Sequence, residues 1–253
     1  DTDTDTDTDT DTDTDTDTES SSDSGTESDT APDTGTGSGD ADTDTDTGSG
    51  DTDTGSDTGA YSRTITIDGS NDFTPGEQLS TTTTGYDGYV TWDDTYLYLG
   101  VQGDVVDDGS ASVFWVVYLG ATGSGDANGQ TYNTQQPALP FEATHHLRWR
   151  ADNGFTGAMT TGGSGWSDAG WDFTGDVFQS GTFVEMRVPL ADLGDPSTIA
   201  LHMSLLREET MDESTWAGVP ASSFTDGYDP DYTEYYSFDL AGAIAPGGYD
   251  PVS

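Results

Sequence analysis

Three tryptophans lie in segments that can present their rings to a ligand. Trp166 and Trp171 stand among glycines and serines in residues 162–172, and Trp216 lies in the stretch 214–220. An exposed indole stacks on the apolar face of a pyranose ring, and neighbouring carboxylates accept hydrogen bonds from sugar hydroxyls. We therefore expect a carbohydrate-binding site built from Trp166, Trp171, Trp216, Asp168 and Asp172. The alternative is that the three rings close the ends of the core under long loops.

Two groups of aspartates in expected turns have the chemistry of a calcium site. One group holds Asp104, Asp107 and Asp108, and the other holds Asp226, Asp229 and Asp231. Calcium takes six to eight oxygen ligands, and clustered loop carboxylates supply them. Ca²⁺ is thus the one cofactor we expect, although so acidic a chain also brings carboxylates together by chance. No pair of carboxylates is marked out as a glycosidase acid and base, and we expect no catalytic residues and no enzymatic activity.

The sequence places no two of the three histidines where they are expected to bind one metal ion together. His145 and His146 are adjacent on an expected strand, so their side chains point to opposite faces. A haem would need a histidine or methionine facing a second axial ligand across a pocket. His145, Met159 or His202 can supply such a ligand, which leaves a haem-binding electron-transfer domain as a distant alternative.

Arginine is the only basic residue besides histidine, and the chain has five. Four of them, Arg148, Arg150, Arg187 and Arg207, lie on or beside expected strands and are expected to pair with acidic neighbours such as Glu185, Glu208 and Glu209. A site for an acidic sugar on the strand face that carries His146, Arg148 and Arg150 is a further alternative.

The elements that must position these residues are strands. From Tyr61 onward apolar and polar residues alternate with period two, and glycine-rich turns separate the runs. Strands are expected over residues 63–68, 88–93, 96–102, 113–119, 145–151, 183–190, 199–206 and 233–240. In the run 183–190, alternation is expected to point Met186 inward and Glu185 and Arg187 outward, toward solvent. Trp92, Trp115 and Trp149 are expected in the core, and residues 191–194 form one helical turn closed by glycine. The pattern predicts an all-β fold, an antiparallel β-sandwich of jelly-roll or immunoglobulin type.

Three motifs in this segment resemble a known family. They are Ile67-Asp68-Gly69 with Asp72, the run from Val90 to Leu99 (VTWDDTYLYL), and the run from Val184 to Gly194 (VEMRVPLADLG). Residues 62–240 resemble family-9 carbohydrate-binding modules and the wider DOMON-like group, while residues 120–140 and 152–172 match neither. The resemblance implies a β-sandwich that binds sugars, with relatives that bind haem or calcium.

Residues 1–60 differ from the rest of the chain. They hold 21 acidic residues and no aromatic residue or base, so they cannot bury enough apolar surface to fold alone. Residues 61–253 are expected to form one domain. The first eighteen residues are nine Asp-Thr repeats, which predict an extended spacer or an O-glycosylated stalk. The expected acceptors are Thr2, Thr4, Thr6, Thr8, Thr10, Thr12, Thr14, Thr16 and Thr18. Asp42, Asp44 and Asp46 have the alternate spacing of a calcium loop, but the glycine comes one position late.

Composition excludes several partners. The formal net charge is −44, so the chain repels nucleic-acid phosphates and anionic lipids. No apolar run is long enough to span a membrane, and without cysteine there are no disulfides. The chain starts at Asp1, as a processed protein does, and we expect an extracellular or cell-surface location. The expected function is non-catalytic glycan binding or adhesion; the alternative is a subunit of an extracellular filament or surface layer that binds neighbouring copies as a homopolymer.

Overall fold

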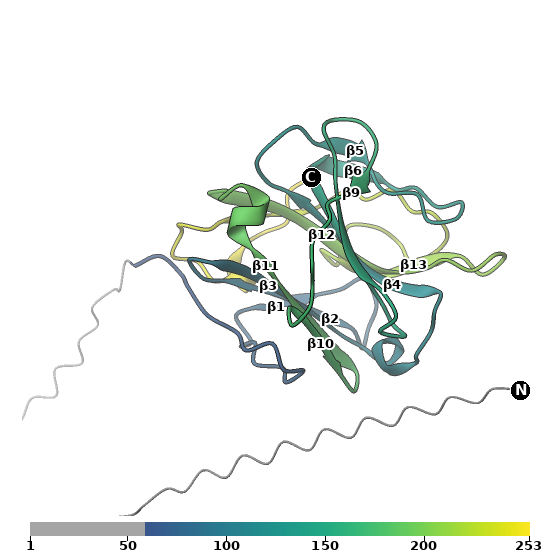
Figure 1. Cartoon of the computed structure of the whole chain (residues 1–253), viewed down its shortest axis with the longest axis horizontal. Helices are drawn as coiled ribbons and strands as arrows, with labels where there is room; N and C mark the ends of the chain where they lie inside the picture. The colour runs from purple at the N-terminus through teal and green to yellow at the C-terminus, as the bar shows by residue number, and fades with distance from the viewer. Residues whose placement is uncertain (1–58) are drawn as a thin grey trace, which may run out of the picture. The chain divides into compact units, whose positions relative to one another are not determined.

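A computed structural model describes residues 59–253 (Figure 1). The Asp-Thr repeats, the nine threonines expected to carry sugars and the aspartates at positions 42–46 lie outside the described residues. The described chain consists of strands joined by turns, with three short 3-10 helices: η1 (Asp104–Asp107), η2 (Leu190–Leu193) and η3 (Pro246–Gly248).

The smaller of the two main sheets has five antiparallel strands in the order β1-β2-β3-β11-β10. Their bounds are β1 Gln78–Ser80, β2 Asp87–Trp92, β3 Tyr96–Gln102, β11 Phe183–Pro189 and β10 Val177–Ser180. The expected β2–β3 hairpin is confirmed, because Asp93 accepts hydrogen bonds from the backbone N–H groups of Thr95 and Tyr96 and closes the turn.

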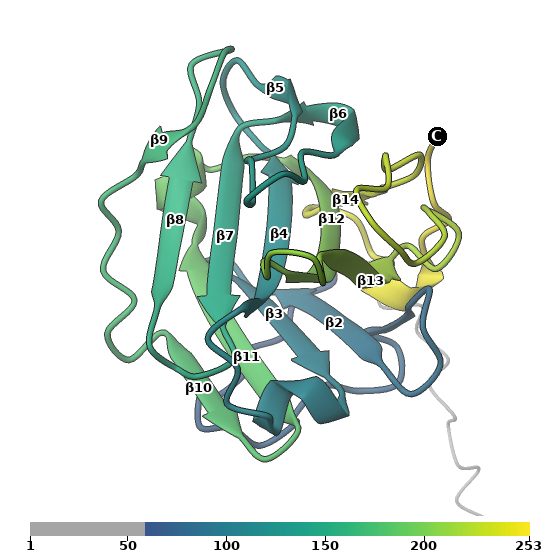
Figure 2. The ribbon, with the colours of Figure 1, turned by 90° about the vertical axis from the view of Figure 1, so that its right-hand side faces the viewer.

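The larger sheet has the strand order β13-β12-β4-β7-β8-β9, with β14 paired to the other half of β12. Their bounds are β4 Val113–Gly120, β7 His145–Arg150, β8 Thr156–Thr160, β9 Ser167–Asp168, β12 Thr198–Arg207, β13 Ser214–Val219 and β14 Tyr236–Asp239. Strand β4 is central, as its unbroken apolar run predicts. A separate hairpin of β5 (Asp126–Asn128) and β6 (Ala138–Ala143) lies near the end of this sheet (Figure 2).

The main core lies between the two sheets. Trp92 from the smaller sheet and Trp115 and Trp149 from the larger one are almost fully buried in a single apolar cluster. Met186 and Leu205 join it from opposite sheets, as the alternation along their strands predicts. The all-β fold and its antiparallel pairing are therefore confirmed.

Two expectations about the smaller sheet are wrong. Residues 63–68 form no strand, because the segment is tied to the sheet through the single backbone bond from Arg63 N–H to the Trp92 carbonyl. Glu185 points away from the core as expected, yet it is fully buried. Its Oε1 accepts hydrogen bonds from the backbone N–H groups of Asp68 and Gly69, so the incoming chain covers it.

Three of the four arginines form ion pairs other than the expected ones, while Arg148 interacts electrostatically with Glu208 as expected. Arg187 pairs with Asp176 at 2.6 Å, since Glu185 already binds the backbone of residues 68–69, and Arg207 pairs with Asp212 at 2.9 Å. Arg150 pairs with Asp152 at 2.7 Å, and Arg148 lies over the ring of Phe155. These four arginines therefore fix local turns and ring contacts.

Candidate functional site

The structure separates the three candidate tryptophans. Trp216 lines a pocket with a volume of about 490 Å³. Trp171 and Asp172 line a second hollow of about 360 Å³. Trp166 and Asp168 line neither, so the five expected carbohydrate residues do not form one site.

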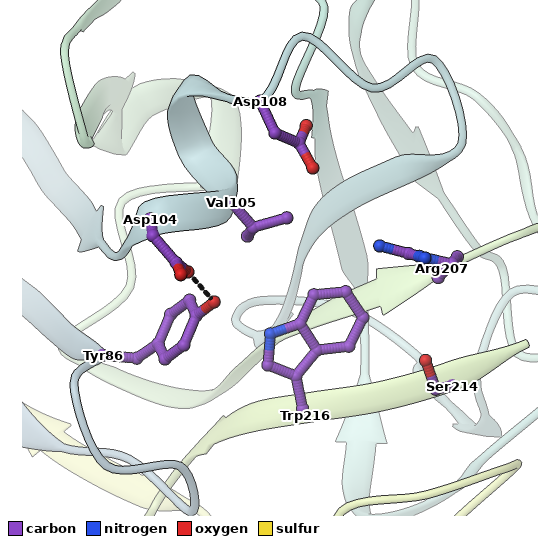
Figure 3. Close-up of a pocket in the computed structure, with 7 residues that line it drawn as sticks. All are labelled: Tyr86, Asp104, Val105, Asp108, Arg207, Ser214 and Trp216. Carbon is purple, nitrogen blue, oxygen red and sulfur yellow. Dashed lines mark hydrogen bonds between the residues drawn. The ribbon is translucent and has the colours of Figure 1, made fainter.

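The Trp216 pocket brings together three parts of the chain. Tyr86 precedes β2, Asp104, Val105 and Asp108 come from η1 and the residue after it, and the other lining residues belong to β12 and β13. Figure 3 shows the indole of Trp216 at the centre, with Tyr86 and Asp104 on one side and Arg207 on the other. The lining residues are Tyr86, Asp104, Val105, Asp108, Arg207, Ser214 and Trp216.

One wall of the pocket is a paired tyrosine and carboxylate. The Tyr86 hydroxyl donates a hydrogen bond to Oδ1 of Asp104 (Figure 3). Burial and this hydrogen bond raise the pKa of Tyr86 to about 12, so the hydroxyl stays protonated. The ring lies against Gly103, where a β-carbon would come within 2.0 Å of a ring carbon. The absence of a side chain at Gly103 thereby leaves room for the Tyr86 ring.

The opposite wall carries hydrogen-bond donors. Arg207 ends β12 opposite Ser214 at the start of β13, so strand register places both side chains at the pocket. Arg207 Nη1 donates to Asp212, while its Nε is buried without a hydrogen-bond partner. The pocket therefore offers an aromatic ring, carboxylate acceptors, a guanidinium donor and a hydroxyl to one ligand.

The sequence prediction found only part of this pocket. Trp216 was expected in a carbohydrate site, and Asp104 and Asp108 in a calcium site. Tyr86 and Ser214 were missed, and Arg207 was assigned only to ion pairing. Pairing Arg207 with Ser214 across a hairpin is the signal that could have found these two residues, but residues 214–219 were not expected to form a strand.

All three candidate tryptophans are half-buried, and Trp171 and Trp216 both pack against the main core. The Trp171 ring stacks on His145 at 5.4 Å and packs against the main core, although Asp172 and Thr174 leave a polar hollow beside it. The Trp166 Nε1–H donates to the Asn128 carbonyl at 2.9 Å, and its ring packs near Tyr118. Both positions agree with the alternative that these rings close the core.

The expected calcium ligands of the second group each accept hydrogen bonds from other parts of the protein. Asp226 accepts from the hydroxyls of Thr82 and Thr83, Asp229 from Gln136 N–H and Asp231 from Ala138 N–H. Asp107 lies outside the Trp216 pocket that Asp104 and Asp108 line. Among residues 59–253 no three acidic, histidine or cysteine side chains are gathered as metal ligands.

The histidines lie under aromatic rings. His146 is fully buried, bonds the Tyr132 hydroxyl at 2.7 Å and stacks on Tyr118, so it offers no open face beside Arg148 for an acidic sugar. His202 is fully buried and stacks on Tyr232 at 3.8 Å. Met159 lies on β8 opposite His146.

Comparisons with protein-family models, with curated proteins and with solved structures find no match to this chain. The resemblance to family-9 modules therefore remains a prediction from three motifs. Within residues 59–253, no helix has the length and apolar character needed to cross a membrane.

Proposed function

We propose that this protein is a non-catalytic carbohydrate-binding protein of the cell exterior, and that its ligand lies on Trp216. The observation that carries the proposal is the composition of the Trp216 pocket. An indole ring, two carboxylates, an arginine and a serine line one hollow of about 490 Å³.

A sugar suits this lining better than a purely apolar ligand does. The face of a pyranose ring presents C–H groups that stack on an indole. Each hydroxyl both donates and accepts, so one sugar can donate to Asp108 and accept from Arg207 or Ser214. The Arg207 side chain lines the pocket and is 31% exposed, so its guanidinium can donate to a ligand oxygen. An apolar ligand would leave these groups without partners at a cost of about 1–3 kcal/mol each.

Replacing the pocket ring tests the proposal. We expect Trp216→Ala to weaken binding about tenfold, since losing a stacked aromatic surface costs roughly 0.5–1.5 kcal/mol beyond the area it buries. Calorimetry would measure the dissociation constants of disaccharides of glucose, galactose, xylose, N-acetylglucosamine and glucosamine for both proteins.

The matched control is Phe178→Ala, which removes an exposed ring outside the pocket. It is expected to leave every dissociation constant within about twofold, because it touches no pocket residue. If no sugar in the panel binds the wild-type protein, or if Trp216→Ala binds as tightly as wild type, the proposed function is wrong.

A further inference from the structure

The Trp216 pocket has acidic segments on two sides. Asp104, Asp107 and Asp108 follow one another on one side of it, and the β12–β13 connection carries Glu208, Glu209, Asp212 and Glu213. Arg207 is the only base that lines the pocket, and its guanidinium already pairs with Asp212. The charge around the pocket therefore stays strongly negative.

The two pocket carboxylates have no cation of their own. Within residues 59–253, neither Asp104 nor Asp108 forms an ion pair. Asp104 accepts the Tyr86 hydroxyl, and Asp108 accepts the backbone N–H of Ser110 at 2.7 Å. Both are exposed side chains at the rim, so a ligand can reach them.

An ammonium group fits between these carboxylates and the aromatic rings. Carboxylates form short, charge-assisted hydrogen bonds with ammonium donors. The faces of Trp216 and Tyr86 attract a cation through their ring quadrupoles, worth about 0.5–1 kcal/mol at an exposed site. An anionic sugar such as a uronate would instead meet like charge throughout the rim, which disfavours its approach.

We propose that the sugar bound on Trp216 carries a free amine, as a 2-amino-2-deoxy sugar does. Its ammonium group lies against Asp108 and Asp104, and its hydroxyls accept from Arg207 and bond Ser214. This inference rests on the proposed carbohydrate function and narrows it to one class of ligand.

The test compares two disaccharides that differ in charge. Calorimetry at about pH 5.5, where an aliphatic amine is protonated, measures β-1,4-linked glucosamine disaccharide against its N-acetylated form. We expect the amine form to bind about tenfold more tightly, equivalent to about 1.4 kcal/mol. Asp108→Asn should reduce the ratio of the two dissociation constants from about ten to about two. The substitution removes the charge, while its Oδ1 still accepts the Ser110 N–H.

The matched control is Asp192→Asn, the same loss of charge on η2, outside the pocket. It should leave the ratio near ten. Dilysine serves as a sugar-free dication, and it should bind wild type far more weakly than the glucosamine disaccharide does.

Each outcome bears on a different claim. If the N-acetylated disaccharide binds as tightly as the amine and Trp216→Ala still weakens both, the amine proposal is overturned and the carbohydrate function stands. If dilysine matches the glucosamine disaccharide, or Asp192→Asn lowers the ratio as Asp108→Asn does, the attraction is only to overall charge. If neither of these disaccharides binds, and no other sugar of the panel binds either, both the proposed function and this inference are wrong.

Discussion

Replacing His202 should reduce the loss of stability that buried histidines cause on acidification below about pH 6.5. Burial lowers the pKa of His202 from 6.5 to about 3, and burial lowers that of His146 equally far. The unfolded chain takes up a proton on each imidazole as pH falls through 6.5, whereas the folded protein takes up almost none. Each histidine therefore contributes stability above pH 6.5 and loses up to about 1.4 kcal/mol per pH unit below it.

The variant His202→Gln isolates this effect. Glutamine cannot be protonated, and its amide can still bond the Ser223 hydroxyl, which lies 3.0 Å from His202 Nε2. Urea unfolding at pH 7, 6 and 5 should give a pH slope about 1 kcal/mol per unit shallower for the variant than for wild type. Comparing slopes is necessary because burial raises the pKa of Glu185, which makes the folded state more stable as pH falls.

Equal slopes for the two proteins would contradict a buried neutral His202. Should the variant not fold, the imidazole C–H resonances of wild type provide the same test. Those of His202 and His146 should not titrate between pH 8 and 5. A midpoint near 6.5 for either ring would show that it is solvated and free to charge.

Gly103→Ala is expected to weaken sugar binding at least about thirtyfold, or about 2 kcal/mol. A β-carbon there would lie 2.0 and 2.2 Å from two ring carbons of Tyr86, so the ring must move. Its movement removes one wall of the pocket and breaks the hydrogen bond to Asp104. The φ of Gly103 is 167°, an extended conformation that alanine adopts, so the effect is steric crowding of Tyr86 and not backbone strain.

The matched control is Gly162→Ala, where a β-carbon has no atom within 4 Å. It should bind as wild type does, and calorimetric titration of the tightest disaccharide would measure both variants. Thermal melting must accompany the titration, because moving Tyr86 also costs packing. Wild-type affinity in Gly103→Ala would show that Tyr86 is no part of the site.

The strands that the sequence predicted are those with strong local patterns. β4 is apolar on both faces and β11 alternates, so hydrophobic periodicity alone located them. β8, β9 and β10 lie in or next to glycine-rich stretches where periodicity is weak. The burial of Glu185 was unpredictable for another reason. It depends on residues 68 and 69, more than a hundred positions away, which fold across the sheet and bind its carboxylate.

The candidate site was likewise only partly predictable, because its residues are distant in the sequence. Trp216 was found because an indole in a polar stretch is conspicuous. Its neighbours Tyr86, Asp104 and Arg207 come from three separate parts of the chain, which only the tertiary fold brings together. Local sequence also could not show that Trp166 and Trp171 are held by Asn128 and His145.

The most direct test of the account is to observe the tryptophans while a sugar binds. The chain has six, so its ¹H–¹⁵N spectrum should show six indole N–H signals, which single Trp→Phe variants would assign. Titration with the glucosamine disaccharide should shift the Trp216 indole signal and leave those of Trp166 and Trp171 in place. Shifts confined to Trp171 or Trp166, with Trp216 unchanged while the sugar binds, would contradict the central claim that Trp216 lines the binding site.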